Sequence, residues 1–265
     1  MNGAEAVLTS LKNEGVDVVF GYPGGAVLTL YDAVYKMKFP HILTRHEQGA
    51  VHAADGYARA TGKVGVVFAT SGPGATNLVT GISTAYTDSV PLVCITGQVA
   101  NSYIGKDSFQ EADVCGITTP ITKHNYLVKK VEDLPRVLKE AFYIARTGRP
   151  GPVVVDVAKD VFDTKLDYAY PESVHLRGYS GENIGDEREI DAVVEAIRAA
   201  KKPLVFAGGG VILSETADVL QDIVRRLGAP STATLLGLGA IPADEKGFLS
   251  FAGMHGCLLY TSPSP

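Results

Sequence analysis

The sequence has little cysteine, no clustered basic charge and no long apolar run. Its three cysteines, Cys94, Cys115 and Cys257, are far apart and have no metal-ligand spacing, which indicates a reducing compartment. A net charge of −5 argues against nucleic-acid binding. No stretch approaches the roughly 18 apolar residues of a membrane span, and the N-terminus has no signal-peptide pattern. We therefore predict a cytoplasmic protein with no membrane segment and no metal site.

The sequence does contain a regular alternation of short apolar runs and helical patterns. Residues 16–20, 64–70, 91–96 and 153–157 are predicted strands, and residues 26–38, 75–86 and 134–147 are predicted helices. Continuous β-branched runs between helices are typical of an α/β fold with a parallel sheet covered on both faces. Glycine turns at 21–25 and 71–74 follow two of these strands, where such sheets usually bind ligands.

The alternation stops near residue 162 and restarts near 187. The later predicted elements are helices at 187–200 and 215–227, strands at 203–207 and 231–235, and a glycine turn at 208–210. We predict a first domain at 1–163, a linker at 164–186 and a truncated Rossmann-like α/β domain at 187–256. Residues 257–265 leave a β/α unit unfinished, and we interpret them as a tail that is not native.

Glu47 admits a structural interpretation. Thr44 and Glu47 have the spacing of a helix capping box, with Thr44 as N-cap and Glu47 at N3. An acidic residue also suits the first turn of a helix. The spacing alone therefore favours a helix cap over a catalytic role.

Two glycine segments admit a nucleotide-binding interpretation. Residues 72–77 resemble the dinucleotide pattern G-x-G-x-x-G with Asn77 in the last place, but no acidic residue ends a second strand about 20 residues later. Gly208, Gly209 and Gly210 would let a ligand approach the backbone, or would form a flexible turn. A non-enzymatic nucleotide-binding module is thus an alternative, and the missing acid argues against it.

Eight short segments, taken together, are far more specific than any one alone. They are GYPGG at 21–25, RHEQGA at 45–50, AADGYAR at 53–59, TSGPGATN at 70–77, IGKDSFQE at 104–111, TKHN at 122–125, GRPGP at 148–152 and GMHG at 253–256. This series resembles the large catalytic subunits of the acetolactate synthase family of thiamine-diphosphate enzymes. The resemblance runs from about Ala4 to Gly256.

The resemblance implies that the first domain binds the pyrimidine ring of thiamine diphosphate. Glu47 would hydrogen-bond a ring nitrogen and so promote removal of the thiazolium proton. Gly25 would lie beside the cofactor, and Gln110 would lie at the active site. Further cofactor-binding positions at the second glycine turn are Gly72, Gly74 and Asn77.

The resemblance also implies roles for two further groups of positions. Those that match FAD contacts are Arg149, Gly208, Gly209, Gly210, Thr234, Leu235, Gly253, Met254 and His255. Those that match the substrate channel are Ala100, Phe109, Lys123 and Lys159, and cations there suit anionic 2-oxoacids. Ala100 stands where proline is frequent in the family, which changes the shape of the expected channel.

The resemblance also implies an activity. Pyruvate would be decarboxylated and joined to a second pyruvate or to 2-oxobutyrate, in branched-chain amino-acid biosynthesis. The family's Mg²⁺- and diphosphate-binding domain has no counterpart in this chain, so we expect the fragment to be inactive alone. A homodimer or homotetramer with a small regulatory subunit is expected. The alternatives are an FAD-free catabolic acetolactate synthase and another thiamine-diphosphate decarboxylase.

Overall fold

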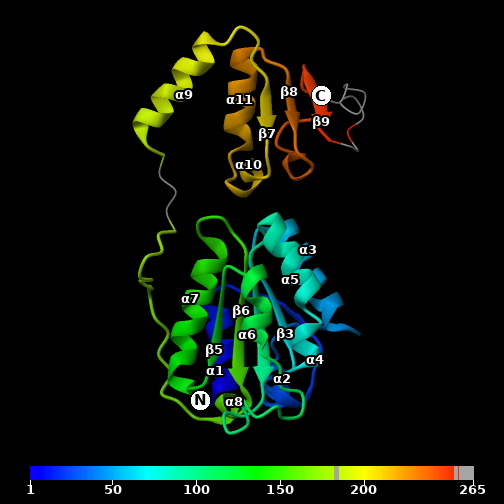
Figure 1. Cartoon of the computed structure of the whole chain (residues 1–265), viewed down its shortest axis with the longest axis vertical. Helices are drawn as coiled ribbons and strands as arrows, with labels where there is room; N and C mark the ends of the chain where they lie inside the picture. Colours follow the sequence, from blue (N-terminus) through cyan, green and yellow to red (C-terminus); the bar gives the residue numbers. More distant parts are fainter. Residues whose placement is uncertain (182–184, 254–255, 257–265) are drawn as a thin grey trace. The chain divides into compact units, whose positions relative to one another are not determined.

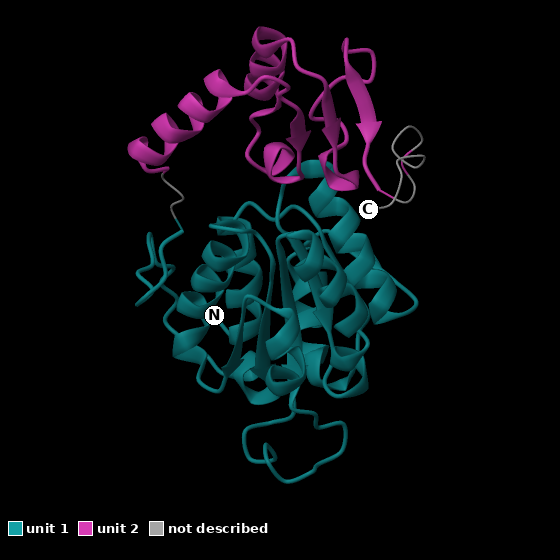
Figure 2. Cartoon of the chain, turned by 45° about the horizontal axis from the view of Figure 1, so that its top comes forward, with its two compact units in different colours: residues 1–183 teal, residues 184–265 magenta. Residues whose placement is uncertain are grey.

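The chain folds into two compact α/β units, residues 1–183 and 184–265 (Figures 1 and 2). The structure, a computed structural model, describes residues 1–181, 185–253 and 256. Met254, His255 and the tail 257–265, for which the sequence led to predictions, lie outside the described residues.

A six-stranded sheet forms the centre of the first unit, with strand order β2-β1-β3-β4-β6-β5. The strands are β1 (Val19–Gly21), β2 (His41–Leu43), β3 (Gly65–Ala69), β4 (Leu92–Gln98), β5 (His124–Val128) and β6 (Pro152–Ala158). Neighbouring strands pair in parallel throughout, which confirms the predicted parallel sheet. Strands β3, β4 and β6 are buried along their whole length, because helices cover both faces.

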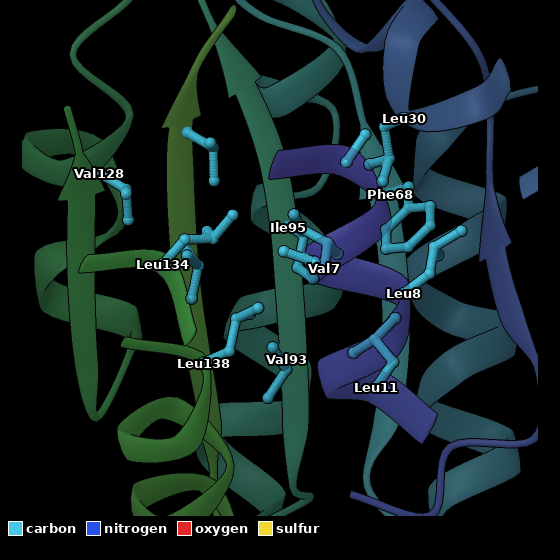
Figure 3. Packing of buried hydrophobic residues seen from close by; sticks show 14 of the residues in the cluster. Val7, Leu8, Leu11, Leu30, Phe68, Val93, Ile95, Val128, Leu134 and Leu138 are labelled. Carbon is cyan, nitrogen blue, oxygen red and sulfur yellow. The ribbon is translucent and has the colours of Figure 1, made fainter. Parts of the chain in front are cut away.

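Helices pack on each face of this sheet (Figure 1). One face carries α1 (Gly3–Asn13), α2 (Leu28–Lys36), α7 (Leu134–Arg146) and α8 (Lys159–Asp163). The other carries α3 (Glu47–Thr61), α4 (Pro73–Thr76), α5 (Val79–Asp88) and α6 (Val114–Thr118). Figure 3 shows the first face, where Leu8 of α1 and Leu138 of α7 pack near Phe68 and Ile95 of the sheet.

Short 3₁₀ turns connect some of these elements. They are η1 (Gly25–Val27), η2 (Thr119–Ile121) and η3 (Val131–Asp133). The helix predicted at 75–86 is in fact two helices, α4 and α5, because Asn77 and Leu78 interrupt it. The helix predicted at 26–38 begins as η1 and continues as α2.

The strand order reverses between β1 and β3. From β1 the chain crosses one face through α2 to reach β2, and then returns across the other face through α3 to reach β3 on the opposite side of β1. Ligands of open parallel sheets bind outside the carboxyl ends of the strands at such a reversal. The glycine turns at 21–25 and 71–74 follow β1 and β3, so both lie at this edge of the sheet.

The second unit contains a smaller parallel sheet with strand order β7-β8-β9. Its elements are α9 (Glu187–Ala199), β7 (Val205–Ala207), α10 (Gly210–Leu213), α11 (Ala217–Leu227), β8 (Ser231–Ala233), η4 (Leu235–Gly237) and β9 (Phe248–Phe251). The strand predicted at 231–235 ends at Ala233, because Thr234 begins the η4 turn. Among the residues that the structure describes, no helix has both the length and the apolar character needed to cross a bilayer.

Candidate active site

Glu47 lies at the start of α3, and only 7% of it is exposed. The predicted capping box is wrong, because His46 is the N-cap and its Nδ1 accepts a hydrogen bond from the Gln48 amide at 3.1 Å. Thr44 instead donates from Oγ1 to the carbonyl oxygens of Gly21 and His46. The Glu47 carboxylate is therefore directed to partners outside its own helix.

Asn77 is such a partner. Its Nδ2 donates to Glu47 Oε2 at 2.9 Å, across 30 residues of sequence. A Cβ at Gly74 would lie 3.1 Å from Glu47 Oε1 and 2.6 Å from Thr70 Cγ2. The segment 74–77 therefore contacts both carboxylate oxygens: Asn77 donates to Oε2, and the backbone of Gly74 lies close to Oε1.

The two glycine turns contact each other through Thr70. The Ala26 amide donates to Thr70 Oγ1 at 3.1 Å, which ties the segment after β1 to the end of β3. A Cβ at Gly24 would come within 2.5 Å of the Thr70 side chain. Glycine at 24 and 74 thus lets both turns close around one small, buried side chain.

Tyr31 of α2 lies against Gly21, where the glycine turn at 21–25 begins. A Cβ at Gly21 would meet the Tyr31 hydroxyl at 2.4 Å, and that hydroxyl is buried without a hydrogen-bond partner among the described residues. Burial raises the pKa of Tyr31, and the negative charge of Glu47 raises it further. The phenol therefore stays protonated beside the Glu47 carboxylate.

A cavity of about 470 Å³ opens at the carboxyl edge of the sheet, a size that suits a small ligand. Five residues predicted from the resemblance line it together: Gly25, Ala100, Phe109, Gln110 and Lys159. They come from three separate segments, at the end of β1, between β4 and α6, and at the start of α8. The structure thus brings together positions that are more than 130 residues apart in the sequence.

Gln110 has an unusual backbone conformation, with φ of 59°. Gly72 lies against it, and a Cβ at Gly72 would be 2.4 Å from the Gln110 carbonyl oxygen. Gly72 itself has φ of +57°, which favours glycine for a second reason. The segment 72–77, which includes the end of the turn and helix α4, therefore contacts both Glu47, through Asn77, and the segment that carries Gln110.

Two predicted residues lie at the opposite, amino edge of the sheet. The Lys123 amide donates to the Pro152 carbonyl at 2.9 Å, where β6 begins, and Lys123 Nζ donates to the Thr147 carbonyl at 2.7 Å. Arg149 Nε donates to Ser89 Oγ at 2.7 Å at the same edge. Neither Lys123 nor Arg149 lines the cavity.

The predicted flavin contacts of the second unit that are described meet at the carboxyl edge of its sheet. Gly208–Gly210 follow β7, Thr234 and Leu235 follow β8, and Gly253 follows β9. The Thr234 amide donates to the Ala207 carbonyl at 2.8 Å, which fixes the turn after β8 beside the turn after β7. A Cβ at Gly208 or Gly210 would meet nothing within 4 Å, whereas a Cβ at Gly209 would lie 3.0 Å from Leu236 Cβ.

Sequence reasoning missed several residues at the cavity. Tyr103, Asp160 and Asp163 also line it. Asp160 accepts hydrogen bonds from the Asn101 amide at 3.1 Å and from Asn101 Nδ2, and Asp163 accepts one from Thr29 Oγ1 at 2.6 Å. For Asp160 and Asp163 the available signal was their position shortly after the predicted strand 153–157, at the edge where ligands bind.

Comparison with protein families identifies the class. Residues 1–117 match the thiamine pyrophosphate enzyme N-terminal TPP binding domain, and residues 190–261 match the thiamine pyrophosphate enzyme central domain. The chain belongs to the thiamine pyrophosphate enzyme family. The matched residues 1–117 include Glu47, Asn77 and Gln110, and thiamine diphosphate is the cofactor that this family implies.

Within that family the chain is similar to acetolactate synthase large subunits. It is 56% identical over 261 residues to the acetolactate synthase large subunit of Haemophilus influenzae, covering 97% of this chain and 46% of that protein. It is 53% identical over 259 residues to the acetolactate synthase isozyme 3 large subunit of Escherichia coli, with 97% and 45% covered. The probable acetolactate synthase large subunit of Methanocaldococcus jannaschii is 50% identical. The chain spans about half the length of these relatives.

Proposed function

We propose that this chain forms the pyrimidine-binding part and some of the central domain of an acetolactate synthase catalytic subunit. Such an enzyme joins two 2-oxoacids with loss of carbon dioxide, in branched-chain amino-acid biosynthesis. The observation that carries the proposal is the buried Glu47 carboxylate, held by Asn77 at the strand-order reversal. The similarity to acetolactate synthase large subunits supports it.

The residues around Glu47 fit the aminopyrimidine ring of thiamine diphosphate. When bound, the cofactor supplies the nucleophilic carbon that attacks the substrate. Asn77 fixes the carboxylate through Oε2, so Oε1, on the side of Gly74, can share a proton with a ring nitrogen. Glycine at 74 lets the backbone lie close to that oxygen, since a Cβ there would be 2.6 Å from Thr70 Cγ2 and 3.1 Å from Glu47 Oε1.

The cavity fits a small anionic substrate. Lys159 supplies a cation, and Gln110 supplies an amide that can donate a hydrogen bond to a carboxylate or carbonyl oxygen. The two acidic residues in the lining already accept hydrogen bonds from Asn101 and Thr29. We therefore assign the 2-oxoacid to the side of the cavity formed by Gln110 and Lys159, with Phe109 and Ala100 shaping the entrance.

FAD and Mg²⁺ are further parts of the proposal. The open space beside Gly208 and Gly210 fits a flat ligand such as a flavin, with the Thr234 turn beside it. Within the described ranges, no group of three His, Cys, Asp or Glu side chains could hold a metal ion, so we assign Mg²⁺ to other parts of the longer protein. A homodimer or homotetramer in the cytoplasm, with a small regulatory subunit, completes the proposal.

The test replaces Glu47 in an enzyme of full length. Residues 1–256 of this chain, joined in register to the remainder of the Haemophilus influenzae relative, supply that enzyme. With pyruvate, thiamine diphosphate and Mg²⁺, Glu47→Gln should lower acetolactate formation by roughly 100-fold or more without lowering Tm. Glu132→Gln, the same change at an exposed position, should leave activity unchanged.

The same assay separates the alternatives. An enzyme that keeps full activity with Glu47→Gln would show that the carboxylate does not activate the cofactor. A purified enzyme without flavin absorbance would favour the FAD-free catabolic form, and a product other than acetolactate would favour another decarboxylase. The 265-residue chain by itself is expected to be inactive.

A further inference from the structure

The loop 99–113 carries five of the cavity residues, Val99, Ala100, Tyr103, Phe109 and Gln110, yet it contains no helix or strand. Its position must therefore come from side-chain contacts. Glu111 shapes the loop internally, because its carboxylate accepts hydrogen bonds from the Ser108 amide at 2.9 Å and from the Gly105 amide. These contacts fix the loop's own conformation but do not attach it to the sheet.

Asn101 attaches the beginning of the loop, through its amide to Asp160 and through Nδ2 to the Lys129 carbonyl. Gln98, the last residue of β4, attaches the end of the loop. Its Oε1 accepts a hydrogen bond from the Val99 amide at 2.8 Å, where the loop begins. Its Nε2 donates to the Ala112 carbonyl at 2.8 Å, two residues after Gln110. Only 4% of Gln98 is exposed, so water competes little for these contacts.

The carboxylate of Asp156 orients the side chain of Gln98. Gln98 Nε2 also donates to Asp156 Oδ2 at 2.9 Å, and Thr96 Oγ1 donates to Asp156 Oδ1 at 2.6 Å. Asp156 lies in β6, opposite Thr96 in β4, and is 1% exposed. Two donors aimed at the two oxygens suit an ionised carboxylate, which accepts without donating.

We propose that Asp156 is a positioning residue for the loop 99–113, acting through Gln98 to place Phe109 and Gln110 at the cavity. Asp156 does not itself line the cavity, so its effect on any ligand is indirect. The importance of the loop rests on the function proposed above. The attachment itself is a property of this chain and can be measured without substrate.

The charge on Asp156 provides a way to test the attachment. Burial raises the pKa of Asp156 to about 6, the hydrogen bonds from Thr96 and Gln98 oppose that rise, and the charge of Asp113 adds to it. Cys115 is the other titratable group described as interacting with Asp156, and it is held neutral because burial raises its pKa to about 11. The first two turns of α5, on the same face, carry no titratable side chain.

Protonation should weaken the attachment. Below pH 6 the Asp156 carboxyl becomes neutral, and the hydrogen bond from Gln98 loses the strength that a charged acceptor gives it. Loop amides should then exchange with solvent about fivefold faster than at pH 7.5, after correction for intrinsic exchange rates. The wild-type chain alone is enough for this measurement, with the α7 amides as the internal reference.

Thr96→Val supplies a matched control for Gln98→Leu. Each substitution removes one hydrogen bond to the same buried carboxylate, but only Gln98 is also bonded to the loop. Hydrogen exchange of the 265-residue chain, followed by mass spectrometry at pH 7.5, should show loop amides exchanging at least tenfold faster in Gln98→Leu. In Thr96→Val the loop should change no more than the α7 reference.

Asp156→Asn offers Gln98 an uncharged acceptor at every pH, so its loop should exchange at the rate of the wild type below pH 6, about fivefold faster than the wild type at pH 7.5, and should lose the pH dependence of loop exchange. Equal loosening of the loop by Thr96→Val and Gln98→Leu would overturn the proposal, since general destabilisation would then explain both. A wild-type loop whose exchange does not change through pH 6, or an Asp156→Asn loop that still titrates, would also overturn it. None of these outcomes depends on whether the chain serves acetolactate synthesis.

Discussion

The contact between Gly72 and Gln110 can be tested by adding a single methyl group. Alanine at 72 would adopt φ of 57° and ψ of −116°, a sparsely populated region for residues with a Cβ that costs about 1–3 kcal/mol, and its Cβ would lie 2.4 Å from the Gln110 carbonyl oxygen. Because the neighbour is backbone, relief requires a shift of the loop, at a cost of about 1–3 kcal/mol more. Gly105→Ala is the matched control, since Gly105 has φ of +80° and nothing within 4 Å of its Cβ position.

We expect Gly72→Ala to lower the free energy of unfolding by about 3 kcal/mol and Gly105→Ala by about 1 kcal/mol. For a unit of this size these losses correspond to roughly 9 °C and 3 °C in Tm. Because the sequence has no tryptophan, far-UV circular dichroism during thermal and urea unfolding of the 265-residue chain is the suitable measurement. Equal losses in the two variants would refute the close contact between the turn and the loop.

Three further predictions concern buried carboxylates. The pKa of Asp156 lies above its ordinary 3.8, at about 6, so its contribution to stability is present below pH 3.8 and is lost as pH rises through 6. In urea unfolding, the free energy of unfolding of Asp156→Asn should therefore rise by about 3 kcal/mol relative to wild type between pH 4 and 8. A difference between the two proteins that does not change with pH would contradict this. Glu14 accepts a hydrogen bond from the Tyr170 hydroxyl at 2.8 Å. Glu14→Gln should lower the free energy of unfolding by about 2 kcal/mol and speed amide exchange near residue 170. Unchanged exchange there would show that this contact does not hold the segment around Tyr170. Asn77→Asp would place a second carboxylate beside Glu47, so the acid limb of the pH–activity profile of the full-length enzyme should move to higher pH, and an unmoved limb would argue against this geometry.

The sequence predicts the strands whose residues are all buried, because their side chains are then almost all apolar. The runs at 64–70 and 153–157 become β3 and β6, which are apolar because both faces are buried. Strand β5 was missed, because it lies at the sheet edge and only its last residue, Val128, is fully buried. Helix α1 was also missed, since alanines and a serine on its buried face make its periodicity weak.

At the candidate site, too, some features can be predicted from the sequence and others exist only in the folded chain. The resemblance selects Gly25, Gln110 and Lys159, and the structure places all three around one cavity. The resemblance does not show that Lys123 lies at the other edge of the sheet, because that depends on where β5 and β6 begin. Nor could spacing show that Asn77 reaches Glu47, a contact that exists only after β1 and β3 pair.

The strand-order reversal also has a kinetic consequence for folding. Phe20 of β1 pairs with Val67 of β3, with β2 and α3 lying between them in the chain. Closing a loop of roughly fifty residues costs about 3 kcal/mol of chain entropy before the pairing is rewarded. Nascent chains that have made β1, β2 and α3 therefore still lack the pocket, and the two glycine turns can meet only after the ribosome has released β3. The cofactor site should consequently form late in folding, when the sheet is completed, and not when its first strands form.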